Sequence, residues 1–210
     1  FENFCWHAWR AFGVQSAYVE VYPDSHRQSK NVLNCNKIYI DLDMDQVTPP
    51  SMSTAYDDMR SLVRFFKQTY DYCPRVYFSG GRGFAVYVDF EPVLLTKFSE
   101  TMHTFHSKLV ELAGLRTIDS SPIGDDRRVS RIPYTVHHKT EMMCYPVDIT
   151  WTLSKILTDA LKVGNQEVII EKCGSISDDL LILNEEMSKV AVGEYVSTIS
   201  NGNGTLDKLV

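Results

Sequence analysis

The sequence predicts an α+β domain, because short runs with strand periodicity are interleaved with longer segments of helical periodicity. Alternation of apolar and polar residues indicates strands at 17–22, 37–43 and 84–90. Apolar residues spaced three and four positions apart indicate amphipathic helices at 51–72 and 98–114. We therefore expect a mixed or antiparallel sheet with helices packed on one of its faces.

Composition excludes several classes of protein. Hydrophobic residues make up 44% and charged residues 23% of the 210 positions, and the formal net charge of -6 gives no global signal for nucleic acid. The five cysteines are widely spaced and form no Cys-x-x-Cys pair, so we expect free thiols and no zinc site. No apolar run approaches a membrane span and no signal peptide opens the chain, so we expect a cytoplasmic protein that is not secreted and has no membrane partner.

The segment 37–45 ends an apolar strand in a group of carboxylates. Because residues i and i+2 of a strand share a face, Asp41 and Asp43 should project side by side, with Leu42 turned into the core. Two adjacent carboxylates repel each other unless a cation lies between them, and Mg²⁺ or Mn²⁺ prefers such oxygen ligands. The alternative is a strand that ends in solvated acids. We expect Asp45 to support such a site without being a primary ligand.

Glycines at 79–83 lie between two strand-like runs, 75–78 and 84–90. This strand–loop–strand order differs from the strand–loop–helix order of a Walker A loop. Glycine allows backbone N–H groups to approach a phosphate closely, and Arg82 adds a positive charge. The alternative is a hairpin turn that uses glycine for positive φ angles.

Two histidines, His103 and His106, lie three positions apart in the second predicted helix. That spacing could bind a metal, but we expect two exposed side chains.

A third acid and a basic cluster follow this helix. Asp119 comes directly after a short apolar segment, and we expect the charged loop 125–128 that follows it to be a solvated face. The segment 131–140 has an extended, proline-containing pattern and carries the densest group of basic and imidazole side chains. Such side chains suit a triphosphate or a nucleic-acid backbone, and the alternative is a basic surface strand.

The remaining segments complete the predicted organisation. We expect a helix at 4–12, an edge strand at 144–149, helices at 151–164 and 178–191, and a short strand at 168–170. The predicted divisions are a core at 1–150, a helical accessory segment packed on it at 151–196, and a tail or linker at 197–210. The abrupt start suggests a fragment of a longer protein.

Four segments in order, spread over about half the chain, resemble motifs of the archaeo-eukaryotic primase superfamily, the primase-polymerases. The segment 39–43 resembles that family's Asp-hydrophobic-Asp motif, and 79–84 resembles its Ser-Gly-x-x-Gly-x-His motif. The pair 118–119 resembles the third motif, and 131–140 is similar to an Arg-hydrophobic-Pro…His-x-Lys-Thr stretch. One position departs from the pattern, because Ala85 stands where the family has a phosphate-binding histidine.

The resemblance implies a DNA primase or polymerase that joins nucleotides from nucleoside triphosphates on single-stranded DNA by a two-metal mechanism. It implies a catalytic core of two small subdomains with the active site between them, located in the cytoplasm or wherever the replicating DNA is. The partners would be a DNA template and primer, nucleoside triphosphates, and a helicase or a further domain of the same polypeptide. The residues implied in catalysis and in binding two Mg²⁺ or Mn²⁺ ions are Asp41, Asp43 and Asp119. The residues implied in nucleotide binding are Ser79, Gly80, Gly81, Arg82, Gly83, Arg131, His137 and Lys139.

The departure at Ala85 leaves three explanations open. The protein could bind phosphate through Ser79, Arg82 and the loop amides alone, it could carry an introduced change, or it could be a weakened or non-catalytic subunit that binds nucleic acid. A metal-dependent nuclease is a further alternative, and the glycine loop speaks against it because a nuclease has no triphosphate to hold.

Overall fold

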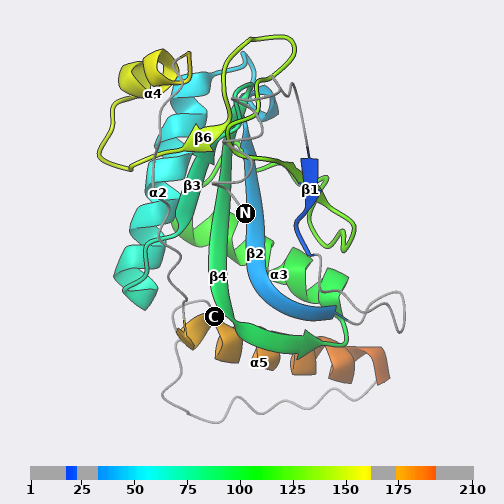
Figure 1. Ribbon diagram of the computed structural model, residues 1–210. Coiled ribbons are helices and arrows are strands. Elements are labelled where there is room, and N and C mark those ends of the chain that lie inside the picture. Colours follow the sequence, from blue (N-terminus) through cyan, green and yellow to red (C-terminus); the bar gives the residue numbers. More distant parts are fainter. Residues whose placement is uncertain (1–17, 23–32, 162–173, 193–210) are drawn as a thin grey trace.

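A four-stranded sheet forms the centre of the fold in the computed structural model, which describes residues 18–22, 33–161 and 174–192 (Figure 1). The sheet order is β2-β4-β3-β6, and every pairing among these described strands is antiparallel. The sheet is therefore antiparallel and not mixed. Its strands are β2 (Leu33–Asp43), β3 (Arg75–Phe78), β4 (Gly83–Leu95) and β6 (Tyr145–Pro146).

Two amphipathic helices cover one face of this sheet, as the sequence predicts (Figure 1). They are α2 (Met52–Tyr70), capped by the Ser51 hydroxyl, and α3 (Phe98–Ala113), which ends at Gly114. The core lies between these helices and the sheet, where Ile38, Ile40 and Leu42 of β2 are completely buried. The acids that alternate with these residues in β2 therefore face the other way.

A separate two-stranded ribbon lies next to the opposite face of the sheet. It pairs β1 (Tyr18–Glu20) with β5 (Val129–Arg131) in antiparallel orientation. The Tyr87 hydroxyl of β4 donates a hydrogen bond to the Ser130 hydroxyl of β5, with 2.5 Å between the oxygens. The ribbon is thus attached to the face that carries the acids.

The C-terminal part of the described chain is helical. A short helix, α4 (Leu153–Asp159), is followed by α5 (Gly174–Val192), which packs on β4 and α3 (Figure 1). The apolar side chains that α5 adds to the core are Ile176, Leu180 and Leu183. Within the described ranges, no helix combines the length and apolar character needed to cross a bilayer.

Some predicted elements lie outside the described residues. They are the helix at 4–12, the short strand at 168–170 and the tail at 197–210. The division into a core and an accessory segment stays a prediction.

The prediction of two exposed histidines on α3 is wrong for His106. His103 is exposed, but His106 is only 3% exposed. Its Nδ1 lies 2.8 Å from the Met102 carbonyl oxygen and its Nε2 lies 3.3 Å from the Tyr39 carbonyl oxygen. Burial lowers the pKa of His106, and the neutral ring can donate its one N–H to only one of these carbonyl oxygens. His106 therefore lies buried between α3 and β2 and does not pair with His103 around a metal.

The close contact between β4 and β2 generates the first prediction. A Cβ on Gly83 would lie 1.7 Å from the Leu42 carbonyl oxygen, so no side chain fits without moving a strand. We expect Gly83→Ala to lower the free energy of unfolding by about 3 kcal/mol, measured by urea denaturation. Gly114→Ala is the control, because its site is open and only its positive φ of 66° opposes a side chain, at about 1 kcal/mol. Equal losses in the two variants would contradict this strand contact.

Candidate active site

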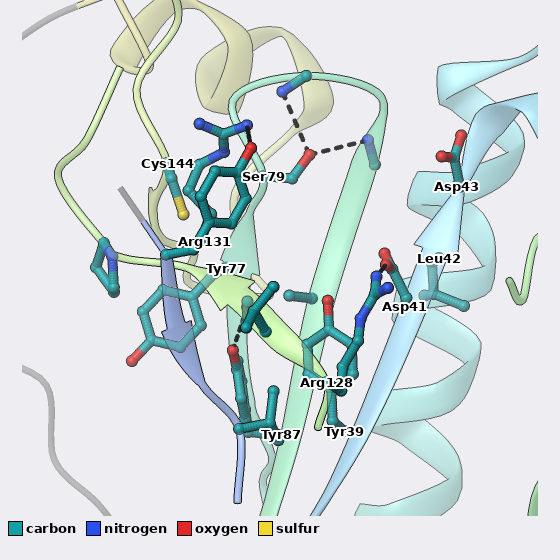
Figure 2. Close-up of a pocket in the computed structure, with 18 of the residues that line it drawn as sticks. Tyr39, Asp41, Leu42, Asp43, Tyr77, Ser79, Tyr87, Arg128, Arg131 and Cys144 are labelled. Carbon is teal, nitrogen blue, oxygen red and sulfur yellow. Dashed lines mark hydrogen bonds and ion pairs between the residues drawn. The ribbon is translucent and has the colours of Figure 1, made fainter. Parts of the chain in front are cut away.

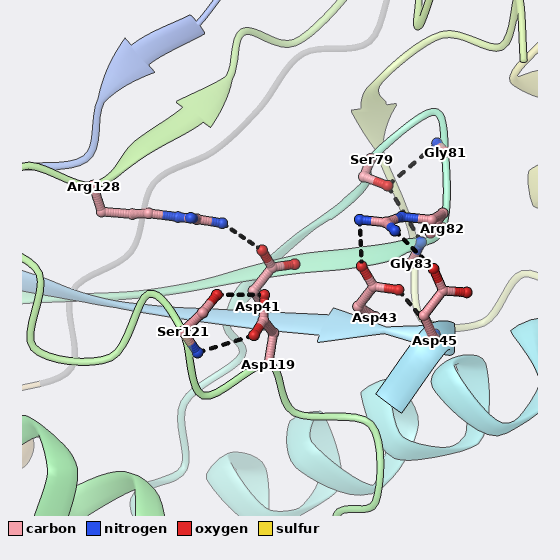
Figure 3. A network of polar contacts seen from close by, with 10 residues as sticks. All are labelled: Asp41, Asp43, Asp45, Ser79, Gly81, Arg82, Gly83, Asp119, Ser121 and Arg128. Carbon is pink, nitrogen blue, oxygen red and sulfur yellow. Dashed lines mark hydrogen bonds and ion pairs between the residues drawn. The ribbon is translucent and has the colours of Figure 1, made fainter. Parts of the chain in front are cut away.

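Strand alternation places the first two acids on one face, and a backbone contact brings the third beside them. Asp41 and Asp43 project from the end of β2 away from the core (Figure 3). The Asp119 N–H donates to the Asp41 carbonyl oxygen at 2.8 Å, and the Asp43 N–H donates to the Thr117 carbonyl oxygen at 2.7 Å. The structure therefore brings the backbone of Asp119 beside two acids from a distant part of the sequence.

Arginines pair with both acids of the strand (Figure 3). The Arg128 Nη2 lies 2.8 Å from an Asp41 carboxylate oxygen. Arg82 bridges two acids, with Nη2 3.0 Å from Asp43 and Nη1 2.7 Å from Asp45. The two guanidinium groups offset the repulsion between neighbouring carboxylates.

Asp41 is held in an environment that disfavours its charge. Burial raises the pKa of Asp41 to about 6, Arg128 works against the rise, and the charges of Asp119 and Asp43 add to it. Burial also disfavours the charged Arg128 guanidinium, but its interactions with Tyr39 and Asp41 raise the pKa of Arg128 overall. The Arg128 guanidinium carbon lies 5.6 Å from the centre of the Tyr39 ring. Arg128 therefore stays charged between an aromatic face and a carboxylate.

The carboxylates have the right chemistry for Mg²⁺ or Mn²⁺, but they are not gathered into one cluster. Within the described part of the chain, no group of three or more His, Cys, Asp or Glu side chains could hold a metal ion as it stands. Asp43 is directed to Arg82, and the Asp119 carboxylate accepts bonds from the N–H and hydroxyl of Ser121 at 2.9 Å each. Oxygen ligands of this kind suit hard divalent cations. The assignment of the acids as metal ligands stays a prediction.

The glycine loop joins β3 to β4 as a tight turn with its own internal bonds. The Ser79 hydroxyl oxygen accepts from the Gly81 N–H at 3.2 Å and from the Gly83 N–H at 3.3 Å. Gly80 has a positive φ of 75°, and its carbonyl oxygen accepts a bond from the Thr140 hydroxyl. Two amides that the sequence analysis assigned to phosphate are thus held by Ser79.

His137 lies against this loop from the side of the basic segment. Its ring atoms Cδ2 and Nε2 lie 3.1 Å from the place where a Cβ of Gly81 would be. Its Nδ1 accepts the Lys139 N–H at 3.2 Å, so the proton of the neutral ring is on Nε2. Burial lowers the pKa of His137, and the charges of Arg131 and other neighbours lower it further. A neutral imidazole with one N–H donor is therefore placed beside the loop.

A cavity of about 640 Å³ lies between the sheet and the β1–β5 ribbon (Figure 2). The predicted site residues that line it are Asp41, Asp43, Ser79, Gly81, Arg82, Gly83, Arg131 and His137. The predicted site residues that do not line it are Gly80, Asp119 and Lys139.

The cavity has a basic and aromatic character that contrasts with the net charge of -6 for the whole chain. Its charged side chains are two acids and five bases: Asp41, Asp43, Lys37, Arg75, Arg82, Arg128 and Arg131. Its aromatic side chains are Tyr18, Tyr39, Tyr77 and Tyr87 (Figure 2). A local excess of positive charge favours an anionic ligand.

Ala85 contributes a small side chain to the floor of the cavity. It lies in β4 directly between Asp41 of β2 and Tyr77 of β3 in the strand register. A residue with a hydrogen-bond donor at this position would therefore face the cavity beside the acids.

Several residues that line the cavity were not predicted from the sequence, and Arg128 and Tyr39 are two of them. The expectation that Arg128 lies on a solvated face is wrong, because Arg128 pairs with Asp41 across 87 positions in sequence. No local pattern marks such a long-range partner. Tyr39 was also missed, although its place two residues before Asp41 puts it on the same face of the strand.

Comparison with known proteins gives no match in sequence and a distant similarity in structure. No protein-family model matches the sequence, and no curated protein matches it. A solved structure of the polymerase domain from Mycobacterium tuberculosis Ligase D in complex with DNA is similar, with 14% sequence identity and a TM-score of 0.39. The similarity covers 93% of this chain and 61% of that domain, so the chain spans less than two thirds of its length.

The environment of Asp41 predicts an unusual pH dependence of stability. Because the pKa of Asp41 is raised from 3.8 to about 6, its contribution to stability is full below pH 4 and is lost as the pH rises through 6. The free energy of unfolding falls by ~3 kcal/mol over this range, and this value already includes the attraction between Asp41 and Arg128. We expect Asp41→Asn to match the wild type near pH 4 and to exceed its free energy of unfolding by ~2–3 kcal/mol at pH 7.

Urea denaturation at both pH values, in the presence of a chelator, measures this difference. A variant that is less stable than the wild type at pH 7 would show that Asp41 is not held in a destabilising environment.

Proposed function

We propose that the protein is a template-dependent nucleotidyltransferase that joins nucleotides from nucleoside triphosphates to a primer on single-stranded DNA. The observation that carries this proposal is the cavity, which runs from the acidic end of β2 past the glycine loop to a basic and aromatic wall. Transfer of a nucleotidyl group requires acids that can hold metal ions close to positive groups that can bind phosphates.

The triphosphate would lie at the glycine loop. Arg82 and Arg131 line this part of the cavity and can pair with phosphate oxygens, and the Nε2–H of His137 can donate to another. The base and sugar would lie over the tyrosine floor, where Tyr77 and Tyr87 offer aromatic surface. In this proposal the phosphates would lie between the positive wall and the acids.

The metal ions would be held by Asp41, Asp43 and Asp119. When bound, two divalent ions lower the pKa of the attacking 3′-hydroxyl and stabilise charge on the α-phosphate and the leaving pyrophosphate. For the acids to take up this role, Asp43 must leave Arg82 and Asp41 must leave Arg128. The released guanidinium groups would then lie next to the phosphates, where they can pair with new anionic partners.

A second candidate function is binding of nucleotide or nucleic acid without chemistry. Two observations favour it. Ala85 offers no donor to a phosphate, and arginines engage both acids of the strand. Metal-dependent incorporation distinguishes the two functions.

Substitution of single acids tests the proposed chemistry. We expect Asp41→Asn and Asp43→Asn each to lower nucleotide incorporation by more than about a hundredfold, measured on primed single-stranded DNA with Mg²⁺ or Mn²⁺. Loss of a residue that only hydrogen-bonds to a metal ligand costs about 10–100-fold in activity, and loss of the ligand itself should cost more. Asp45→Asn is the matched control, since Asp45 also pairs with Arg82 but lies beyond the strand end. We expect it to stay within about tenfold of the wild type.

Normal incorporation by Asp41→Asn would refute the metal assignment. A wild-type protein that binds nucleoside triphosphate but never incorporates it would favour the second candidate function.

The small side chain of Ala85 in the cavity wall generates a gain-of-function prediction. We expect Ala85→His to lower the KM for nucleoside triphosphate a few-fold, equivalent to ~1 kcal/mol, because the imidazole would face the cavity beside Asp41 and could donate to a phosphate. Ala85→Leu fills the same space without a donor and should not lower KM. A fall in KM for both variants would mean that filling the space, and not hydrogen bonding, improves binding.

A further inference from the structure

Asp58 is a buried acid of α2 that the proposed chemistry does not use. Its side chain is 2% exposed, although carboxylates are rarely buried so fully unless they are paired. One carboxylate oxygen accepts the Arg116 N–H at 2.5 Å, the Thr117 N–H at 2.7 Å and the Thr117 hydroxyl at 2.9 Å. The other oxygen accepts from the Arg116 guanidinium, with Nη2 at 3.2 Å.

These bonds hold the segment that carries the third acid. The segment follows the end of α3 at Gly114 and is not itself part of a helix or a sheet strand. Its Thr117 is bound on one side by Asp58 and on the other by β2, where the Asp43 N–H donates to the Thr117 carbonyl oxygen. Two residues further on, the Asp119 N–H donates to the Asp41 carbonyl oxygen. The place of Asp119 beside Asp41 therefore depends on attachment to both β2 and α2.

A carboxylate suits this position better than its amide would. The residue faces backbone and hydroxyl donors on one oxygen and a guanidinium on the other, so all of its neighbours are donors. An asparagine can present an oxygen to only one of these groups and must turn its NH₂ toward the other. Thr117 is completely buried, so solvent cannot replace an acceptor that its N–H loses.

We propose that Asp58 is a positioning residue that fixes Asp119 beside Asp41 for divalent cation binding. This inference rests on the proposed function, in which Asp119 is a metal ligand. Asp58 itself touches neither the cavity nor the acids. It acts through the backbone of Thr117.

Two measurements on Asp58→Asn test the proposal. Hydrogen–deuterium exchange of peptides that cover 115–121 reports whether the segment stays attached, without any metal. Titration with Mn²⁺, followed by the electron paramagnetic resonance of the free ion, reports whether the acids still bind a cation. We expect faster exchange in this segment and about tenfold or weaker Mn²⁺ affinity, the size seen when partners of metal ligands are removed.

Asp89→Asn is the matched control for loss of a buried ion pair. Asp89 is 7% exposed and accepts from Arg75 at 2.7 and 2.8 Å, in the middle of β4, where it pairs in strand register with Lys37 of β2 and not with Asp41. We expect this variant to unfold more easily but to keep the Mn²⁺ affinity and the exchange at 115–121 of the wild type. Thr117→Val removes only the hydroxyl donor to Asp58, and serves if Asp58→Asn does not fold. We expect Thr117→Val to speed exchange at 115–121 and to weaken Mn²⁺ affinity, each by less than Asp58→Asn does.

The outcomes separate this inference from the proposed function. A wild-type protein that binds no Mn²⁺ overturns the metal assignment, and the exchange data then decide alone whether Asp58 holds the segment. Unchanged exchange in Asp58→Asn overturns the positioning role. Faster exchange with unchanged Mn²⁺ affinity, in a wild type that binds Mn²⁺, also overturns it. An equal loss of affinity in Asp89→Asn would mean that general destabilisation is the cause.

Discussion

The structure depends on holding like charges together at the end of β2. Asp41 and Asp43 share a face of the strand because the alternation that buries Ile40 and Leu42 leaves them no other direction. Asp119 then adds a third carboxylate through a backbone bond to Asp41. Burial raises the pKa of Asp41, and the neighbouring charges of Asp119 and Asp43 add to the rise, so the ionised form of Asp41 is disfavoured. A fold that keeps such an arrangement must compensate it with positive charge.

The compensating charges come from different parts of the cavity wall. Arg82 belongs to the glycine loop between β3 and β4, and Arg128 directly precedes β5 of the ribbon. Pairing with the acids therefore attaches both the loop and the ribbon to the end of β2. Anything that changes the charge at the acids, such as a cation or a proton, changes these attachments too. In this way the acidic end and the phosphate-binding loop of the proposed site are coupled through two ion pairs.

Local patterns predicted most of the described helices and strands, but not β5 and not the contacts between residues distant in sequence. The helices α2 and α3, the shared face of Asp41 and Asp43, and the strand–loop–strand arrangement around the glycine loop all follow from periodicity within short windows. The start of β2 at Leu33 was missed, because a bulge between Cys35 and Lys37 interrupts the alternation. Partners that are distant in sequence could not be found in this way. Arg128 joins Asp41 across 87 positions and Asp58 joins Thr117 across 59.

The cavity also shows why the net charge of the chain is a poor guide to its ligand. The chain has six more acidic than basic residues, yet five basic side chains and two acids line the cavity. Since the field inside a cleft depends on the charges that face it, a nucleotide would meet a positive wall within an acidic protein. The two acids of the cavity pair with Arg82 and Arg128, and each of its four tyrosine rings lies within 6.0 Å of an arginine guanidinium carbon. In the proposed function, aromatic surface for a base and positive charge for phosphates would therefore lie side by side along the cavity.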